Sequence, residues 1–196
     1  MKSNYKLYKI AIVIPYYNAS MHITKVVSKL PDYISNIYII DDCGDEDLPS
    51  EELLKNSKVV LLKNSKNLGV GGAVKKGFLK AIEDKIDFVI KLDADDQMDS
   101  SYIPELLDGL IIKKADYSKG NRFRDLRALK KMPFTRKFGN LGLSFLTKVA
   151  TGYWTNFDPT NGFFAIKRES LEQIDFSNLS DRYFFETSLL SELYFT

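Results

Sequence analysis

The sequence predicts an α/β domain in which a mostly parallel β-sheet lies between helices, giving a three-layer sandwich. Two observations predict it: apolar runs alternate with segments of helical periodicity through the first half of the chain, and those runs are apolar almost without interruption. Strands that are apolar on both faces are typical of a parallel sheet buried between helices. With 196 residues, 44% of them hydrophobic and 28% charged, the chain suits one globular domain with a sizeable core.

The first expected unit is strand, helix, strand. Residues 9–18 (KIAIVIPYYN) contain a β-branched apolar run that ends at Pro15, and residues 36–42 (NIYIIDD) form a second strand ending in acids. The segment 20–30 between them places Ile23, Val26 and Val27 at helical spacing.

The remaining elements continue the alternation. We expect a short helix after the acidic loop, strands at 58–64, 87–93 and 115–123, and helices at 69–84 and 104–112. The chain ends in a helix-like pattern at 184–196 (FFETSLLSELYFT) with no cap or polar tail, which we interpret as a truncated C-terminus.

Bulk composition excludes several classes of protein. The single cysteine, Cys43, excludes an intramolecular disulfide and suits a reducing compartment. The single histidine, His22, leaves no basis for a histidine metal site or a serine triad, and we expect it to be an ordinary surface residue. No apolar stretch is long enough for a leader peptide or a membrane span.

Polar and glycine residues cluster at four expected strand ends. Pro15, Tyr17 and Asn18 follow the first strand, Asp41 and Asp42 the second, residues 64–72 the third, and Asp93 to Asp95 the fourth. Ligands of open α/β sheets bind beyond the carboxyl ends of the strands. The sequence therefore predicts one ligand site that all four strand ends share.

The acids of FVIKLDADDQMDSSY, residues 88–102, point to a divalent cation. Asp93 and Asp95 alternate as the chain leaves a buried strand, so both side chains are expected to reach one hard cation, with Asp96 or Gln97 as a third ligand. Mg²⁺ or Mn²⁺ takes one or two protein carboxylates and completes its shell with water and substrate phosphates. For Asp99 we favour a simpler role as a helix cap.

Two further segments suit a nucleotide. Asp41 and Asp42 are expected to accept hydrogen bonds from a base or ribose, the alternative being ordinary turn acids. Gly69 and Gly72 begin an expected helix, where backbone N–H groups bind phosphate. The glycine spacing fits neither a dinucleotide fingerprint nor a Walker loop, and close helix–sheet packing explains Gly77 equally well.

Residues 119–137 carry eight basic side chains against one acid. Basic side chains beside aromatic residues suit an anionic amphiphile or a membrane surface, and Arg122 and Arg136 are the expected bidentate phosphate donors. The alternative is a solvated charged face. No recognition helix or nucleic-acid motif accompanies the run, so we expect no nucleic acid partner.

Together these segments resemble the family 2 glycosyltransferases with the GT-A fold, especially the polyprenyl-phosphate (dolichol-phosphate mannosyltransferase-like) branch. The resemblance rests on IVIPYYN, IIDD, NLGVGGAVKKGF, KLDADDQ, KGNRF, DPTNGFFAIKRE and RYFFETSLLSEL, in that order along nearly the whole chain. It implies one Rossmann-like GT-A domain over residues 1–196, with a nucleotide-sugar half (1–118) and an acceptor half (119–196).

The resemblance also implies roles for single residues. Pro15, Tyr17 and Asn18 would border the nucleotide and Asp42 its base. Asp93, Asp95 and Gln97 would hold Mg²⁺ or Mn²⁺. The expected acceptor side comprises Arg122 and Arg136 for the acceptor phosphate and Asp158, Asn161 and Gly162 around the sugar.

The expected activity is inverting transfer of a sugar from a UDP- or GDP-sugar to a polyprenyl phosphate, by a protein peripheral to the cytoplasmic face of a membrane. Two alternatives remain: transfer to a saccharide hydroxyl in cell-surface polysaccharide synthesis, with Asp96 or Asp158 as base, or nucleotide-sugar binding without catalysis.

Overall fold

The computed structural model describes residues 4–46, 51–120 and 161–195. In the first two ranges the elements are η1 (Tyr5–Leu7), β1 (Ile10–Tyr16), α1 (Ser20–Ser28), β2 (Asn36–Asp41), α2 (Glu51–Leu54), β3 (Val59–Lys63), α3 (Val70–Glu83), β4 (Phe88–Lys91), η2 (Ser100–Tyr102), α4 (Ile103–Ile111) and β5 (Tyr117–Lys119). The third range holds β6 (Phe164–Lys167), α7 (Arg168–Leu171), η4 (Phe176–Asn178) and α8 (Phe185–Phe195).

Six strands form a single sheet in the order β3-β2-β1-β4-β6-β5. The strands β3, β2, β1 and β4 are mutually parallel, whereas β6 runs antiparallel to both β4 and β5. The expectation of a mostly parallel sheet is therefore confirmed. The carboxyl ends of β1, β2, β3 and β4 lie along one edge of the sheet, which is where the predicted site residues follow.

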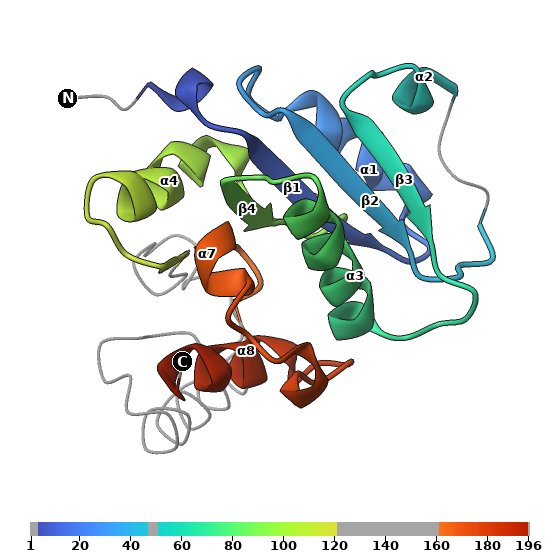
Figure 1. The fold of residues 1–196 in the computed structure, drawn as a ribbon. Coiled ribbons are helices and arrows are strands. Elements are labelled where there is room, and N and C mark those ends of the chain that lie inside the picture. Colours follow the sequence, from blue (N-terminus) through green and yellow to red (C-terminus); the bar gives the residue numbers. More distant parts are fainter. Residues whose placement is uncertain (1–3, 47–50, 121–160, 196) are drawn as a thin grey trace, which may run out of the picture.

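Alternation along β1 divides the core into two layers. Ile10, Ile12 and Ile14 pack with α1 and α4 on one face, while Ala11 and Val13 pack with α3, α7 and α8 on the other. Figure 1 shows α3 in front of the sheet and α1 behind it. The expected three-layer sandwich is thus confirmed, and the helical spacing of Ile23, Val26 and Val27 correctly predicted the buried side of α1.

One strand was missed, and it changes how the sheet ends. No strand was expected at residues 164–167, but they form β6 between β4 and β5. The short run Phe164-Ala165-Ile166 follows Gly162 closely, so its strand character was masked by its neighbours. The predicted acceptor half therefore contributes a central strand to the same sheet, and the division at residue 118 stays a prediction.

No helix in the described ranges is both long and apolar enough to cross a bilayer.

Candidate active site

The carboxyl ends of β1 and β4 open into a pocket of about 560 Å³. Six of the predicted site residues line it: Pro15, Tyr17, Asp42, Gly69, Asp93 and Asp95. Its other lining residues, none of which was given an individual role from the sequence, are Tyr16, Ala19, Asn67, Val70, Ala73, Ala94, Arg182 and Tyr183. The predicted convergence of separate strand ends on one site is therefore observed for these six residues.

A second hollow of about 720 Å³ lies beside α1 and η2. Its lining includes Asp96 and Gln97 but no strand end, and it is a more open depression. We assign the candidate site to the smaller pocket, because polar residues from several strand ends meet there.

Asp93 and Asp95 enter the pocket from the loop that follows β4. One oxygen of Asp93, Oδ1, accepts a hydrogen bond from Lys91 Nζ at 2.6 Å, and Asp95 Oδ1 accepts one from the backbone N–H of Gln97 at 3.1 Å. Asp95 is exposed, so its carboxylate is available to a ligand. Gln97 is also exposed but does not line this pocket.

These two carboxylates fit a divalent cation of the Mg²⁺ or Mn²⁺ type. Such cations bind proteins through one or two carboxylates and take the rest of their ligands from water and substrate phosphates. Within the described ranges no group of three or more His, Cys, Asp or Glu side chains is arranged to hold a metal ion by itself. Two acids facing one pocket suit a cation that arrives with a diphosphate.

Asp42 is buried and holds the glycine loop in place. Its Oδ1 accepts from the side chain of Asn64 at 2.7 Å and from the backbone N–H of Leu68 at 2.9 Å, and its Oδ2 accepts from the N–H of Gly69 at 2.7 Å. The carboxylate therefore fixes the loop between β3 and α3 from the end of β2. Asp42 also lines the pocket. Its predicted contact with the base of a nucleotide stays a prediction.

Asp41 lies beside Asp42 but does not line the pocket. Its Oδ1 accepts from the backbone N–H of Gly44 at 3.1 Å and its Oδ2 lies 3.5 Å from Lys63 Nζ. Asn18, which has a positive φ of 49°, accepts from the backbone N–H groups of Asp45 and Glu46 through Oδ1. Both residues organise the turn after β2.

The glycine loop packs closely against the segment before α8. Gly69 has a φ of +87°, and a Cβ there would lie 2.6 Å from the carbonyl oxygen of Asp181. The N–H of Gly72 donates to that same oxygen at 3.0 Å, and the N–H of Gly69 is taken by Asp42. Neither predicted phosphate donor is thus free in this conformation. Gly77 packs against Val13 and Ile40, which agrees with the interpretation of this glycine as a site of close helix–sheet packing.

Tyr16 is the pocket residue that sequence reasoning missed most clearly. The phenol oxygen is buried and has no hydrogen-bond partner in the described part of the chain. Burial, with the nearby carboxylates of Glu46 and Asp41, raises the pKa of the Tyr16 phenol above its ordinary value. A neutral phenol with an unpaired O–H at a pocket wall is a hydrogen-bond donor for a ligand. The signal in the sequence was its position between Pro15 and Tyr17 at the end of the first strand, but no role was predicted for it individually.

Two predicted sugar-side residues lie next to the pocket acids without lining the pocket. Asn161 is buried, and its side chain donates to the Gly120 carbonyl at 2.8 Å and accepts from Phe163 N at 3.1 Å. Gly162 packs against Lys91, Asp93 and Glu186. The predicted residues Arg122, Arg136 and Asp158 lie outside the described residues.

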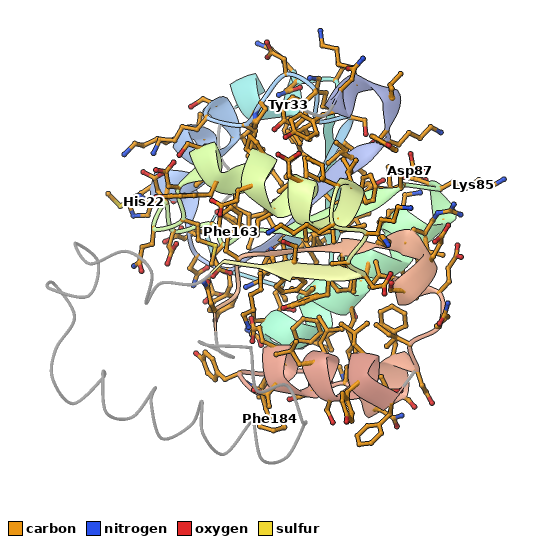
Figure 2. The ribbon with its side chains drawn as sticks, turned by 90° about the vertical axis from the view of Figure 1, so that its left-hand side faces the viewer. His22, Tyr33, Lys85, Asp87, Phe163 and Phe184 are labelled. Carbon is orange, nitrogen blue, oxygen red and sulfur yellow. The ribbon has the colours of Figure 1, made fainter. Side chains whose placement is uncertain are left out.

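Asp96 faces away from the pocket. Its two oxygens form ion pairs with Lys25 of α1 and with Lys29 just after that helix, at 2.6 and 2.5 Å. Hydrogen bonds from these lysines hold the pKa of Asp96 below its ordinary value. A carboxylate committed to two ammonium groups is a poor base, so the structure argues against the predicted catalytic role. Asp99 was expected to cap the helix at 104–112, but it accepts from Ser101 N and caps η2, the short 3-10 helix just before α4. His22 is exposed on α1, where Figure 2 shows it at the periphery.

We predict that Asp96→Asn keeps the activity that the resemblance implies within about twofold of wild type, because Asp96 does not line the pocket. Its lowered pKa favours the folded state above the ordinary pKa of an aspartate, near 4, and that contribution is lost as pH falls through the lower folded value. The stability difference between wild type and Asp96→Asn should therefore shrink below about pH 4, as measured by urea unfolding at several pH values. A large loss of turnover at neutral pH would restore Asp96 to the catalytic machinery.

A six-stranded, mostly parallel sheet with acids facing a pocket at its carboxyl edge is the architecture of GT-A glycosyltransferases. The profile of glycosyl transferase family 2 matches residues 11–175, and the chain belongs to this family. The resemblance and the fold class predicted from the sequence are both confirmed.

Two relatives of this chain have names that state an activity. The chain is 33% identical over 192 residues to the UDP-N-acetylglucosamine–dolichyl-phosphate N-acetylglucosaminyltransferase of Methanococcus voltae, covering 89% of this chain and 75% of the relative. It is 27% identical over 174 residues to the dolichol-phosphate mannosyltransferase of Pyrococcus furiosus, covering 85% of this chain and 48% of that protein.

A solved structure is similar in fold. Glucosyl-3-phosphoglycerate synthase from Mycobacterium tuberculosis, crystallised with Mn²⁺, UDP and glucosyl-3-phosphoglycerate, superposes with a TM-score of 0.68 at 18% identity. The alignment covers 93% of this chain but only 64% of that protein.

Proposed function

We propose that this chain transfers a sugar from a nucleoside diphosphate sugar to a polyprenyl phosphate of the dolichyl type, with Mg²⁺ or Mn²⁺ at Asp93 and Asp95. The observation that carries the proposal is the pocket itself, in which two acids after β4 face Asp42, Gly69 and the aromatic end of β1. Family 2 membership supplies the reaction class, and two relatives named for dolichyl or dolichol phosphate support the acceptor.

The residues suggest a direct displacement. An acceptor phosphate oxygen attacks the anomeric carbon opposite the nucleoside diphosphate, a new C–O bond forms as the bond to the diphosphate breaks, and the configuration inverts. A bound divalent cation supplies positive charge that stabilises the departing diphosphate. Tyr16 and Tyr17 wall the pocket, and the loop that Asp42 fixes closes its other side.

A phosphate acceptor also has the advantage that its attack requires no general base. Phosphate is ionised at neutral pH, so its attack needs no proton acceptor, whereas a sugar hydroxyl needs one. Asp96, one of the two carboxylates predicted for that role, is paired with two lysines outside the pocket. This counts against one of the two bases predicted for the saccharide alternative; the other, Asp158, lies outside the described residues.

The mouth of the pocket suits an amphiphile. Arg182 and Tyr183 line it, Tyr183 is 91% exposed, and its neighbour Phe184 is also exposed. Figure 2 shows Phe184 beside α8 at the margin of the molecule. An arginine next to exposed aromatic side chains offers a phosphate donor beside an apolar surface. We therefore propose that this region meets a membrane surface, on its cytoplasmic side.

The test begins with thermal unfolding in a panel of UDP- and GDP-sugars, each with and without Mn²⁺. We expect one nucleotide to raise the melting temperature in the presence of Mn²⁺ only, because a ligand that binds the folded state stabilises it. Turnover is then measured with that donor and a short polyprenyl phosphate, with and without vesicles, and the product anomer is read by NMR.

The outcomes separate the candidates. Inverted polyprenyl-phosphate sugar, formed faster with vesicles, supports the proposal. Turnover with a saccharide and none with the lipid phosphate would assign the acceptor to a hydroxyl. Donor binding without turnover on either acceptor would favour a binding domain.

A further inference from the structure

A lysine lies buried at the carboxyl end of β4, two residues before the first pocket acid. Lys91 is 1% exposed, and its Nζ lies 2.6 Å from Asp93 Oδ1 and 3.3 Å from Glu186 Oε1 on α8. Lys91 is the last residue of the strand, and no role was predicted for it from the sequence. A buried ammonium is retained only where carboxylates compensate its charge, and here two do so.

The ammonium group of Lys91 occupies the space left by the missing side chain of Gly162. A Cβ on Gly162 would collide with Lys91 Nζ and would lie 3.2 Å from both Asp93 Oδ2 and Glu186 Oε1. The three charged groups therefore meet over Gly162, a residue without a side chain that lies shortly before β6. Strand β4, the loop before β6 and helix α8 all join at this point, so Lys91 is held from several sides.

The contact with Lys91 makes the two carboxylate oxygens of Asp93 different from one another. Oδ1 is committed to Lys91, while Oδ2 has no hydrogen-bond partner among the described residues, and the side chain is 32% exposed on the pocket side. With Lys91 in place, Oδ2 is the oxygen of Asp93 better placed to bind a cation, because Oδ1 already takes part in a charge-assisted hydrogen bond. Removing the ammonium would free both.

We infer that Lys91 is a positioning residue that restricts Asp93 to a single metal-binding oxygen and thereby favours Mg²⁺ and Mn²⁺ over Ca²⁺ at this site. The inference rests on the proposed function, since it requires a cation at Asp93. Mg²⁺ demands near-ideal octahedral geometry at about 2.1 Å, which a bidentate carboxylate disrupts, whereas Ca²⁺ accepts six to eight ligands and binds bidentate carboxylates readily.

The test compares cation affinities without turnover. Mg²⁺ and Ca²⁺ are titrated calorimetrically into protein saturated with UDP, or with GDP if the donor panel selects it. For Lys91→Met we expect the ratio of Mg²⁺ to Ca²⁺ affinity to fall about tenfold relative to wild type, the usual scale for losing a group that orients a metal ligand. A purely structural role would lower stability and leave this ratio unchanged.

The matched control is Lys167→Met. Lys167 pairs with Asp116 at 2.9 Å, and its register opposite Phe88 places it at the other end of β4, away from the pocket. Its removal should leave the affinity ratio at the wild-type value. A similar shift in Lys167→Met would attribute the effect to general destabilisation and overturn the inference.

A second variant guards against misfolding. Lys91→Met alone leaves the buried carboxylate of Glu186 and the half-buried carboxylate of Asp93 uncompensated. The double variant Lys91→Met/Glu186→Gln, which removes one charge of each sign, is therefore measured beside it. It should show the same fall in the ratio. An unchanged ratio in either folded variant, with normal cation binding by wild type, overturns the inference alone. If wild type binds neither cation, the proposed metal site fails, and the inference with it.

Discussion

Asp95→Asn should abolish sugar transfer while the domain stays folded. Asp95 lines the pocket with one carboxylate, is exposed, and accepts one local hydrogen bond, from Gln97 N. Losing a charge that holds the cation removes stabilisation of the departing diphosphate, so we expect kcat to fall at least about 100-fold. The substitution is on the surface, so the free energy of unfolding should change by no more than about 0.5 kcal/mol.

Asp99→Asn is the matched control. It removes an acid from the same loop, and because asparagine also caps helices well, the hydrogen bond to Ser101 N should persist. Activity should stay near wild type. Rates from donor and acceptor titrations, with Mn²⁺ varied separately, provide the measurement. Normal turnover by Asp95→Asn would rule out Asp95 as a metal ligand.

Asp42→Asn should produce the largest loss of stability. An amide has only one accepting oxygen, so its NH₂ group would face donors from Asn64, Leu68 or Gly69 that now bond a carboxylate. Unpaired buried donors and a lost charge-assisted bond together cost about 3 kcal/mol. For a domain of this size that lowers the melting temperature by roughly 6 to 12 °C, measurable by calorimetry.

The same substitution tests whether the loop forms the nucleotide site. We expect nucleotide affinity to fall at least about tenfold at a temperature where the variant is folded, because Gly69 and Asn67 line the pocket. Asp41→Asn is the control: Asp41 does not line the pocket and its partner Lys63 is largely exposed, so both effects should be smaller. Unaltered nucleotide affinity in folded Asp42→Asn would place the nucleotide elsewhere.

Most of the fold was predictable, because each parallel strand and each covering helix has its own local pattern. Runs such as Ile10 to Ile14, and the helical spacing of Leu106, Leu107 and Leu110, report burial directly. Strand β6 was not predictable in this way. Four residues are too few for a period, and its place between β4 and β5 depends on pairing with distant segments.

The site was predictable as a set of strand ends, but not in its internal contacts. Asp93 and Asp95 look equivalent to Asp96 in the sequence, yet a positive φ of 59° at Asp96 accompanies a side chain turned to the two lysines near the end of α1. Similarly, the acid Asp42 and the glycine loop were each assigned to a nucleotide, whereas the structure joins them to one another. Which polar groups are already paired is a tertiary property.

The position of β6 also governs how the chain is assembled on the ribosome. The parallel strands β1 to β4 are complete once residue 91 is made, but the outer edge of β4 has no partner until residues 164–167 emerge. An apolar strand with an open edge is a template for aggregation. We therefore expect nascent chains halted between β5 and β6 to need chaperone protection, and β6 to close the sheet and secure β5 in one late step.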